Sequence, residues 1–397
     1  MIAKLAKRML TGTDKRLLAK FIINFGWKGM RAVRRFQARE RRGEYFPAFL
    51  FLSVTNNCNL RCQGCWVSTT RPPRELDLET MNKVISQAKQ QGTYFYGILG
   101  GEPLLHRGLF QLLENHPDCY FLLFTNGTLI DENIARRMRR LGNVSPLISI
   151  EGRETESDIR RGGSNVYSRT MQGLRTCREQ RLITGAAVSV CTSNIHDLAS
   201  EIFVRELVDL GVSYLWYYIY RPVGPNPSPE LALSQDQVLG LRRFMVDIRD
   251  KAPLLVVDSY WDHLGRALCP AAVGMAHHIG PGGDIEPCPP IQFARENVTN
   301  GKDLFSLFNN SQFLERFRDV VFRTTQGCIL MEQPALLAKV VAEAGAADSS
   351  GRGTAFRELN AMTPRPSHHL PGKEIPEKNR LYRFAKKHWF FGLGAYG

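Results

Sequence analysis

Three cysteines lie within eight consecutive positions in the segment CNLRCQGCW, residues 58–66. The thiolates of Cys58, Cys62 and Cys65 are suitable ligands for zinc or for an iron–sulfur cluster. A structural zinc site needs four protein ligands, a catalytic one needs three and a water, and a [4Fe–4S] cluster needs four thiolates. With three cysteines, one iron of such a cluster stays open to bind a substrate or cofactor. The spacing therefore favours an open cluster over zinc or three core cysteines.

Short apolar segments alternate with helix-like segments from Phe46 to Gly224. Apolar strands separated by helices are typical of a parallel sheet with helices outside. Six such units are too few to close an eight-fold barrel, so we expect an α/β fold with a partial (βα)6 barrel. The expected strands are 46–57, 94–101, 119–127, 146–152, 183–194 and 213–224, and the expected helices are 76–92, 109–116, 131–142, 167–180 and 196–211.

Polar and glycine-rich segments come at the ends of these expected strands. The cysteine triplet follows the first strand, and GGEP, TNG, SIEG and CTSN follow the next four. Ligands of such sheets bind beyond the carboxyl ends of the strands. The sequence therefore predicts one site at one rim of the barrel.

The C-x3-C-x2-C spacing after the first strand, with GGEP after the second, resembles the radical S-adenosylmethionine (SAM) enzymes over about residues 46–224. The resemblance implies that the three cysteines hold a [4Fe–4S] cluster whose open iron binds the amino nitrogen and carboxylate of SAM. It implies that Gly100, Gly101, Glu102 and Pro103 hold the methionyl amino group. The reduced cluster would cleave SAM to a 5′-deoxyadenosyl radical, which attacks a C–H bond or an unsaturated carbon.

Further residues are assigned to SAM only through this resemblance. Ser149 and Glu151 lie where family members contact the SAM ribose or carboxylate. The segment SDIRRGG aligns Arg161 with an arginine that pairs with the SAM carboxylate, and Arg160 is the alternative if the register slips by one residue. Asn194 ends the fifth expected strand, where a polar residue reaches SAM.

One position departs from the family pattern. The residue before the third cysteine is commonly aromatic and packs near the adenine, but here it is Gly64. Either Trp66 takes over that packing, or the adenine meets only backbone. Trp66 as an ordinary core residue is the other interpretation.

A second set of cysteines resembles the auxiliary-cluster module, called twitch or SPASM, that follows the core in many radical SAM enzymes. Cys269 is followed by Gly283, then by Cys288 five positions later, and by Cys328 after a gap. The resemblance implies one auxiliary [4Fe–4S] cluster with three cysteine ligands and an unassigned fourth. The alternatives are a zinc site that uses His277 or His278, and plain buried cysteines. The remaining cysteines are expected to be packing residues: Cys119, Cys177 and Cys191.

The net charge of +14 is concentrated at the two ends of the chain. Residues 1–44 hold 13 Lys/Arg against 3 Asp/Glu, and residues 371–397 hold 6 against 2. The first segment alternates cations with aromatic residues, which suits the surface of an anionic membrane. Docking of an acidic electron donor and a helix packed on the barrel are the alternatives. The neutral body makes nucleic acid an unexpected partner.

We therefore divide the chain into a basic segment (1–44), a radical SAM core (45–230), an auxiliary module (231–345) and a flexible basic tail (346–397). The expected protein is a cytoplasmic enzyme with peripheral membrane contact and a flavodoxin or ferredoxin-type electron donor. Its substrate is lipid-like or a small molecule, with peptide modification as the alternative because such modules are frequent in peptide-modifying members. A non-catalytic iron–sulfur electron carrier is the hypothesis of another class, and GGEP argues against it because a carrier needs no SAM site.

Overall fold

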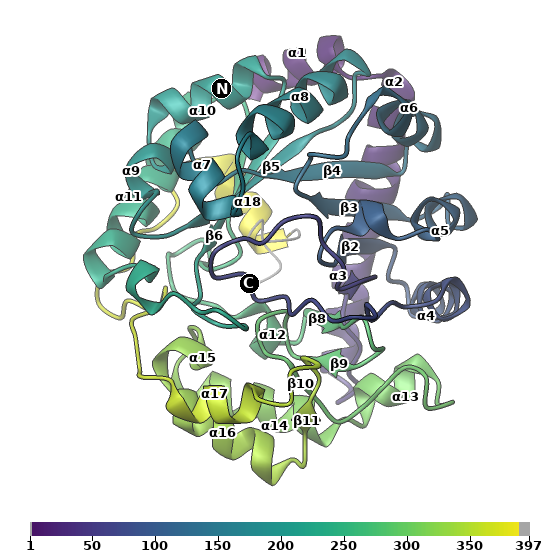
Figure 1. Ribbon diagram of the computed structural model, residues 1–397, viewed down its shortest axis with the longest axis vertical. Coiled ribbons are helices and arrows are strands. Elements are labelled where there is room, and N and C mark those ends of the chain that lie inside the picture. The colour runs from purple at the N-terminus through teal and green to yellow at the C-terminus, as the bar shows by residue number, and fades with distance from the viewer. Residues whose placement is uncertain (1, 389–397) are drawn as a thin grey trace.

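A nine-stranded sheet forms the centre of the computed structural model, which describes residues 2–388 (Figure 1). Its order is β7-β6-β5-β4-β3-β2-β1-β8-β9. The six expected strands are parallel neighbours in chain order, which confirms the α/β partial barrel. They are β1 (Phe49–Ser53), β2 (Phe95–Leu99), β3 (Tyr120–Thr125), β4 (Val144–Ser149), β5 (Gly185–Val190) and β6 (Tyr214–Ile219).

Strands from the C-terminal half extend this sheet at both edges. The strand β7 (Leu255–Val257) pairs with β6, and β8 (Ala276–Ile279) pairs with β1, both in parallel. The strand β9 (Ile285–Glu286) pairs antiparallel with β8. The second cysteine set is therefore attached to the same sheet as the first, on the β1 side.

The outer face of the sheet is covered by helices, as Figure 1 shows. They are α4 (Leu78–Gln90), α5 (Leu109–Asn115), α6 (Glu132–Leu141), α7 (Glu154–Arg161), α8 (Val166–Glu179), α9 (Ile195–Leu198), α10 (Glu201–Asp209) and α11 (Gln235–Lys251). Local sequence sets their ends: in α6 the Asp131 side chain accepts from the Ile134 amide at 2.8 Å, and Gly142 ends the helix at φ +70°.

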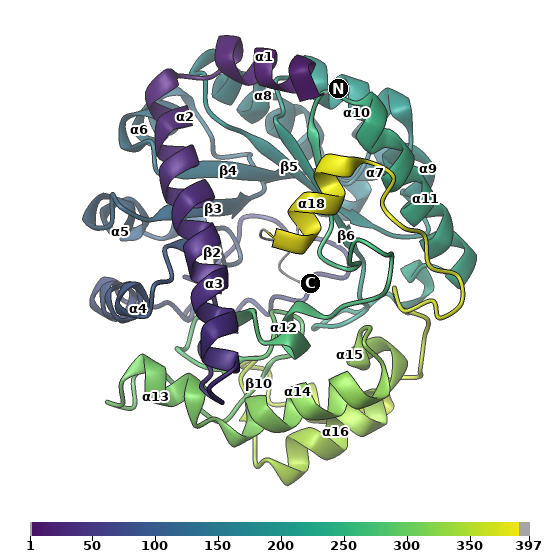
Figure 2. The ribbon, with the colours of Figure 1, turned by 180° about the vertical axis from the view of Figure 1, so that it is seen from behind.

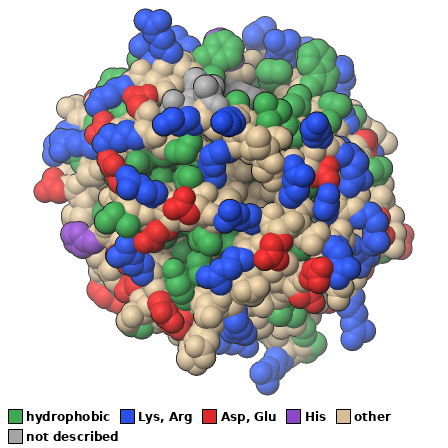
Figure 3. Space-filling model, turned by 90° about the horizontal axis from the view of Figure 1, so that it is seen from above, with side chains coloured by type: hydrophobic (Ala, Val, Ile, Leu, Met, Phe, Trp, Pro, Cys, Tyr) green, Lys and Arg blue, Asp and Glu red, His purple; other side chains and the backbone are tan. Residues whose placement is uncertain are grey.

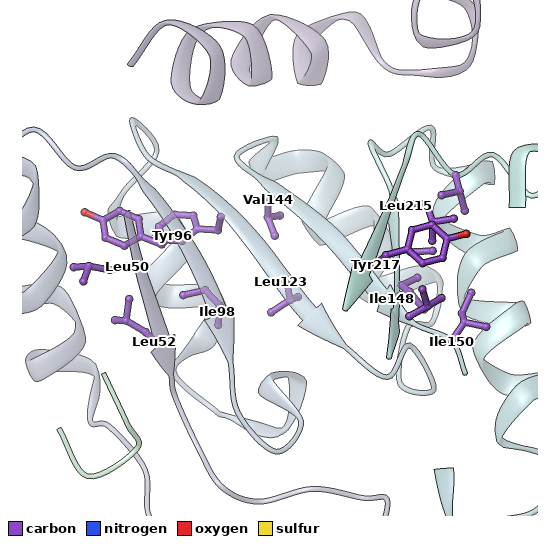
Figure 4. Close-up of a cluster of buried hydrophobic side chains, with 14 of the residues drawn as sticks. Leu50, Leu52, Tyr96, Ile98, Leu123, Val144, Ile148, Ile150, Leu215 and Tyr217 are labelled. Carbon is purple, nitrogen blue, oxygen red and sulfur yellow. The ribbon is translucent and has the colours of Figure 1, made fainter. Parts of the chain in front are cut away.

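Alternation along the strands separates the two faces of the sheet. In β1, Leu50 and Leu52 belong to the large core cluster that packs under the helices, whereas Phe49 belongs to the aromatic cluster inside the barrel. Figure 4 shows the outward set, which includes Tyr96, Ile98 and further strand residues. A period of two therefore leaves an aromatic interior behind the site.

The basic N-terminal segment runs across the amino ends of the strands (Figure 2). It consists of α1 (Ile2–Gly12), α2 (Lys15–Lys20), the π-helical η1 (Phe21–Trp27) and α3 (Lys28–Glu40). The ring of Phe25 lies 4.7 Å from that of Phe95, and Phe21 lies 5.4 Å from Tyr120. These aromatic side chains close the bottom of the barrel, whereas Trp27 is 57% exposed.

A second layer with its own apolar core follows the barrel. It contains α12 (Pro270–Val273), β10 (Phe293–Ala294) paired with β11 (Ala347–Asp348), α14 (Gln312–Thr324), α15 (Ile329–Glu332), α16 (Pro334–Glu343) and α17 (Ala355–Ala361). The helix α13 (Leu304–Asn309) instead packs on α4 as part of the barrel core.

The flexible tail expected from residue 346 differs from the structure, which has β11, α17 and α18 (Arg380–His388) there. The physical reason is a buried ion network: Lys386 of α18 lies 3.1 Å from Asp258. Residues 389–397 of the expected tail lie outside the described residues. Between residues 2 and 388, no helix combines the length and apolar character needed to span a bilayer.

Candidate active site

One cavity of about 360 Å³ meets both cysteine sets. Cys62 and Cys65 of the first set line it, together with Cys269, Cys288 and Cys328 of the second. Its walls also include Leu99, Ser149 and Ile219, which end three of the strands. The cavity therefore lies at the carboxyl rim of the barrel, where the sequence predicts a site, and it adjoins both cysteine sets.

The first cysteine set lies in the loop between β1 and α4. The Leu60 amide donates to Cys58 Sγ at 3.4 Å, and the Cys65 amide donates to the Cys62 carbonyl at 3.3 Å. Burial raises the pKa of Cys58 to about 11 and that of Cys65 to about 12. Buried thiols of this kind ionise when a metal takes the place of the proton.

The separation of the sulfurs distinguishes a cluster from a single ion. Four thiolates around zinc lie about 3.8 Å apart, because Zn–S bonds are about 2.3 Å and tetrahedral. Among residues 2–388, neither cysteine set has its three Sγ atoms all within 4.8 Å of one another. Neither set shows this compact spacing, and the assignment of clusters to them rests on the spacing of the cysteines in the sequence.

A tighter group of potential ligands lies at the opposite end of the barrel. His116, Asp118 and Cys119 place one ligand atom each within 4.8 Å of one another. However, Lys89 Nζ lies 2.8 Å from Asp118 Oδ1, where it already neutralises the carboxylate. Cys119 is fully buried, as are the other expected packing cysteines, Cys177 and Cys191.

The GGEP segment packs directly on the chain that leads to the first cysteine. The Gly101 amide donates to the Thr55 carbonyl and the Glu102 amide to the Asn57 carbonyl, both at 2.7 Å. A Cβ at Gly101 would lie 2.2 Å from the Asn57 carbonyl oxygen, and one at Gly100 would lie 2.7 Å from that of Thr55. Only glycine permits this approach, while Pro103 starts the short 3-10 helix η2 (Pro103–Leu105).

The Glu102 side chain has three partners within the protein. Its carboxylate accepts from Thr125 Oγ1 at 2.8 Å and from the Asn126 and Leu104 amides at 2.8 and 3.1 Å. Burial raises its pKa, and these donors oppose the shift. Glu102 does not line the cavity. In the structure its carboxylate connects the end of β2 to the end of β3. Its contact with the SAM amino group stays a prediction.

An ion pair stands beside the first cysteine set. Arg161 Nη2 lies 2.7 Å from Glu151 Oε1, and Arg161 Nη1 lies 3.8 Å from Cys62 Sγ. Glu151, Ser149 and both arginines line the cavity. Arg160 instead donates to the Gln63 carbonyl at 3.2 Å. The structure thus brings Arg161 close to Cys62, while its pairing with the SAM carboxylate stays a prediction.

Asn194 is buried and makes its bonds to backbone. Its Nδ2 donates to the carbonyls of Glu151 and Ser189 at 3.1 Å, and its Oδ1 accepts from the Cys191 amide at 2.8 Å. It does not line the cavity. Its visible role is to join the ends of β4 and β5, and a contact with SAM stays a prediction.

The glycine before the third cysteine has a specific neighbour. Gly64 has φ +65°, and a Cβ there would lie 2.0 Å from the hydroxyl oxygen of Tyr220. Tyr220 follows β6, lines the cavity and lies 5.1 Å from the Arg160 guanidinium. Trp66 also lines the cavity. Sequence reasoning missed Tyr220, because nothing local signals that its ring fills the space left by Gly64.

The second set comes from three separate turns. Cys269 precedes α12, Cys328 precedes α15, and Cys288 follows the β8–β9 hairpin. Gly283 turns this hairpin at φ +85°, so the segment GDIEPC forms the predicted turn and strand that lead to Cys288. Burial raises the pKa of Cys269 to about 11.

The two histidines considered as zinc ligands have other partners. The ring nitrogens of His277 meet the Pro287 carbonyl and the Tyr45 hydroxyl. Those of His278 meet Glu286 Oε2 at 2.6 Å and Ser53 Oγ at 2.8 Å. Both side chains therefore hold β8 in place and are not free to complete a zinc site.

Comparison with known proteins identifies the class to which this fold and site belong. A model of the Radical SAM superfamily matches residues 52–200. The Fe-coproporphyrin III synthase of Methanosarcina barkeri is 23% identical over 53% of this chain and 55% of its own length. A GTP 3′,8-cyclase of Peptoclostridium acidaminophilum is 30% identical over 48% and 62%. The sporulation killing factor maturation protein SkfB of Bacillus subtilis is 27% identical over 40% and 39%.

Solved structures show the same fold. Streptococcus suis SuiB bound to S-adenosylmethionine has a TM-score of 0.60 at 17% identity, over 72% of this chain and 71% of that one. Residues 52–200 thus carry a radical SAM domain, the domain of a superfamily of enzymes whose members use a [4Fe–4S] cluster and SAM. The chain spans less than two thirds of the length of the curated relatives named above.

Proposed function

We propose that this protein is a radical SAM enzyme that functionalises a C–H bond or unsaturated carbon of a small or lipid-like molecule. The first cysteine set would hold the core [4Fe–4S] cluster, and the second would hold an auxiliary one. The observation that carries the proposal is the single cavity that both sets line. When bound, the core cluster and SAM supply hydrogen abstraction from unactivated C–H bonds. A flavodoxin or ferredoxin-type protein would be the electron donor.

The residues of this chain would orient SAM and exclude water from the reaction. Arg161 and Glu151 form a pair that can orient the charged groups of SAM beside Cys62. Aromatic residues from inside the barrel form the wall opposite the polar rim and exclude water from a bound substrate. They are Phe49, Phe51, Phe124, Trp216 and Tyr218.

Peptide modification is the second candidate. SuiB has been solved with a precursor peptide, and SkfB is named as a maturation protein. The Fe-coproporphyrin III synthase and the GTP 3′,8-cyclase are named for small molecules. The aromatic walls of a cavity of about 360 Å³ favour a small or lipid-like substrate here. They also disfavour a pure electron carrier, which needs no substrate space beside its clusters.

The test of this proposal is cleavage of SAM. The protein, reconstituted anaerobically with iron and sulfide and reduced with dithionite, is expected to convert SAM to 5′-deoxyadenosine and methionine in equal amounts. Chromatography of the quenched reaction measures both products. Absence of 5′-deoxyadenosine from protein that carries its irons would contradict the proposal.

We also propose that the basic N-terminal segment contacts an anionic membrane. Although Phe21 and Phe25 pack on the barrel, Ile22, Ile23 and Trp27 are 57, 53 and 57% exposed. Exposed cations flank them on the adjoining helices α2 and α3: Lys15, Arg16, Arg31, Arg34 and Arg35.

The C-terminal helix adds to this surface. In Figure 2, α18 lies on the same face as α2 and α3, and its Phe384 is 60% exposed beside exposed Arg380, Arg383 and Lys387. On another side of the molecule, seen from above, Lys and Arg side chains are interspersed with apolar and acidic ones (Figure 3). Cations and exposed apolar side chains together suit a bilayer interface.

Sedimentation with liposomes tests this surface. We expect the full-length protein to sediment with vesicles that contain anionic lipid and to stay in the supernatant with neutral ones, because each basic residue near the surface contributes about 1 kcal/mol. The triple variant Ile22→Ser, Ile23→Ser, Trp27→Ser should bind anionic vesicles at least tenfold more weakly. Ile202→Ser is the matched control, since Ile202 is 59% exposed on α10. Equal binding of all three proteins would contradict the proposal.

A further inference from the structure

Arg221 lies between the two cysteine sets. It follows β6, lines the cavity, and donates from Nε to Cys328 Sγ at 3.1 Å. Its guanidinium carbon is 5.3 Å from the centre of the Tyr260 ring. Within residues 2–388, the terminal nitrogens of Arg221 have no hydrogen-bond acceptor and no carboxylate partner.

Three other arginines with little exposure are neutralised by carboxylates. Arg161 pairs with Glu151, and both Arg242 and Arg249 pair with Glu377. A guanidinium carries five N–H donors, and buried donors without acceptors are costly. Arg221 is half-buried and lines the cavity, so its terminal nitrogens are open to a ligand that brings acceptors.

The charge of the cavity wall agrees with an anionic ligand. Arg160, Arg161 and Arg221 line it, whereas Glu151 is the carboxylate among the lining residues and is paired with Arg161. Burial lowers the pKa of the lining His368 to about 3, so this side chain is neutral. No carboxylate in the wall pairs with Arg160 or Arg221, and the Arg221 guanidinium donates to the Cys328 sulfur.

We propose that Arg221 binds an oxyanion of the substrate, a carboxylate or a phosphate, and that the substrate's apolar body lies against the aromatic wall of the barrel interior. The two terminal nitrogens match the paired oxygens of either group. The substrate class is thus an anionic amphiphile. This inference rests on the proposed function, whose substrate class it makes more specific.

Matched ligands of one chain length test the proposal on the full-length, cluster-loaded protein. Decanoate, decyl phosphate and decanol differ only in the head group, and their binding is followed by tryptophan fluorescence, since Trp66 and Trp216 line the cavity. We expect at least one of the two anions to bind tenfold or more tightly than decanol. Which of them binds tighter identifies the oxyanion.

Variants of Arg221 then show whether this residue causes the preference for an anionic head group. R221Q should abolish it while decanol binds as before, and R221K, which keeps the charge without the planar fork, should retain part of it. Arg323→Gln is the control, because the Arg323 side chain is 74% exposed on α14. Equal affinities of the three ligands for the wild type, or an undiminished preference in R221Q, would overturn the proposal.

Iron analysis of the same samples separates this inference from the proposed function. We expect R221Q and the wild type to carry the same iron, so that the lost preference is not a lost cluster. If the wild type held no auxiliary cluster yet kept an Arg221-dependent preference, the anion site would stand and the two-cluster function would fail. If R221K carried full iron but showed no preference over decanol, the proposal would be overturned.

Discussion

Replacing Cys58, Cys62 and Cys65 together with alanine is expected to abolish formation of 5′-deoxyadenosine from SAM. In the proposed function these side chains hold the core cluster, and without them neither the cluster nor its open iron could form. The assay compares the anaerobically reconstituted variant with the wild type under excess dithionite and SAM. The expected loss is complete within detection.

Two further variants show whether the loss of SAM cleavage is specific to the three cysteines of the loop. Cys119→Ala and Cys177→Ala remove buried thiols that lie away from the cavity, so each should retain SAM cleavage near the wild-type rate. Persisting 5′-deoxyadenosine in the triple variant would refute the assignment of the cluster to this loop. An equal loss in the two packing-cysteine variants would show that the assay reports folding instead.

Asp258→Ala is expected to lower the free energy of unfolding by about 3–5 kcal/mol, the cost of breaking a buried ion pair. Asp258 and Glu377 are surrounded by Arg242, Arg249 and Lys386, and these side chains are at most 1% exposed. Removing Asp258 leaves three buried cations facing one carboxylate. Urea unfolding followed by circular dichroism measures the change.

The matched control removes an exposed carboxylate. Asp319 pairs with Arg323 on the surface of α14, where its side chain is 62% exposed, so Asp319→Ala should cost less than about 1 kcal/mol. Burial alone would raise the pKa of Asp258, but Lys386 and the two arginines hold it well below its usual range. Its contribution is therefore full above the ordinary carboxyl pKa and declines as the pH falls toward the folded value. Equal costs for the two variants would contradict this account.

The barrel could be predicted because its signals are local. Apolar strand segments and capped helices repeat in order, and five of the six strands lie within their expected segments, whereas β4 begins at Val144, two residues before its expected start. The sequence does not signal the extra strands in this way. The strand β7 has three residues, and β8 is AHHI, whose two polar histidines are buried and hydrogen-bonded in the structure. Short strands of this kind depend on the sheet edge that receives them.

Long-range contacts explain the remaining differences. The aromatic residues at 21 and 25 suit a membrane in sequence, yet they fill the bottom of the barrel. The C-terminal tail has little apolar periodicity, yet Lys386 anchors it to Asp258, and Glu377 anchors it to Arg242 and Arg249. Tyr220 and Arg221 stand in an ordinary strand end, and only the fold brings them to Gly64 and Cys328.

The central claim is that two four-iron clusters face one cavity, and iron and sulfide analysis tests it most directly. We expect about eight irons and eight sulfides per chain in the reconstituted wild type, because each cluster contains four of both. The Cys269, Cys288 and Cys328 triple alanine variant should retain about four irons and still cleave SAM. A wild type that holds only about four irons, with the same content in that variant, would contradict the claim.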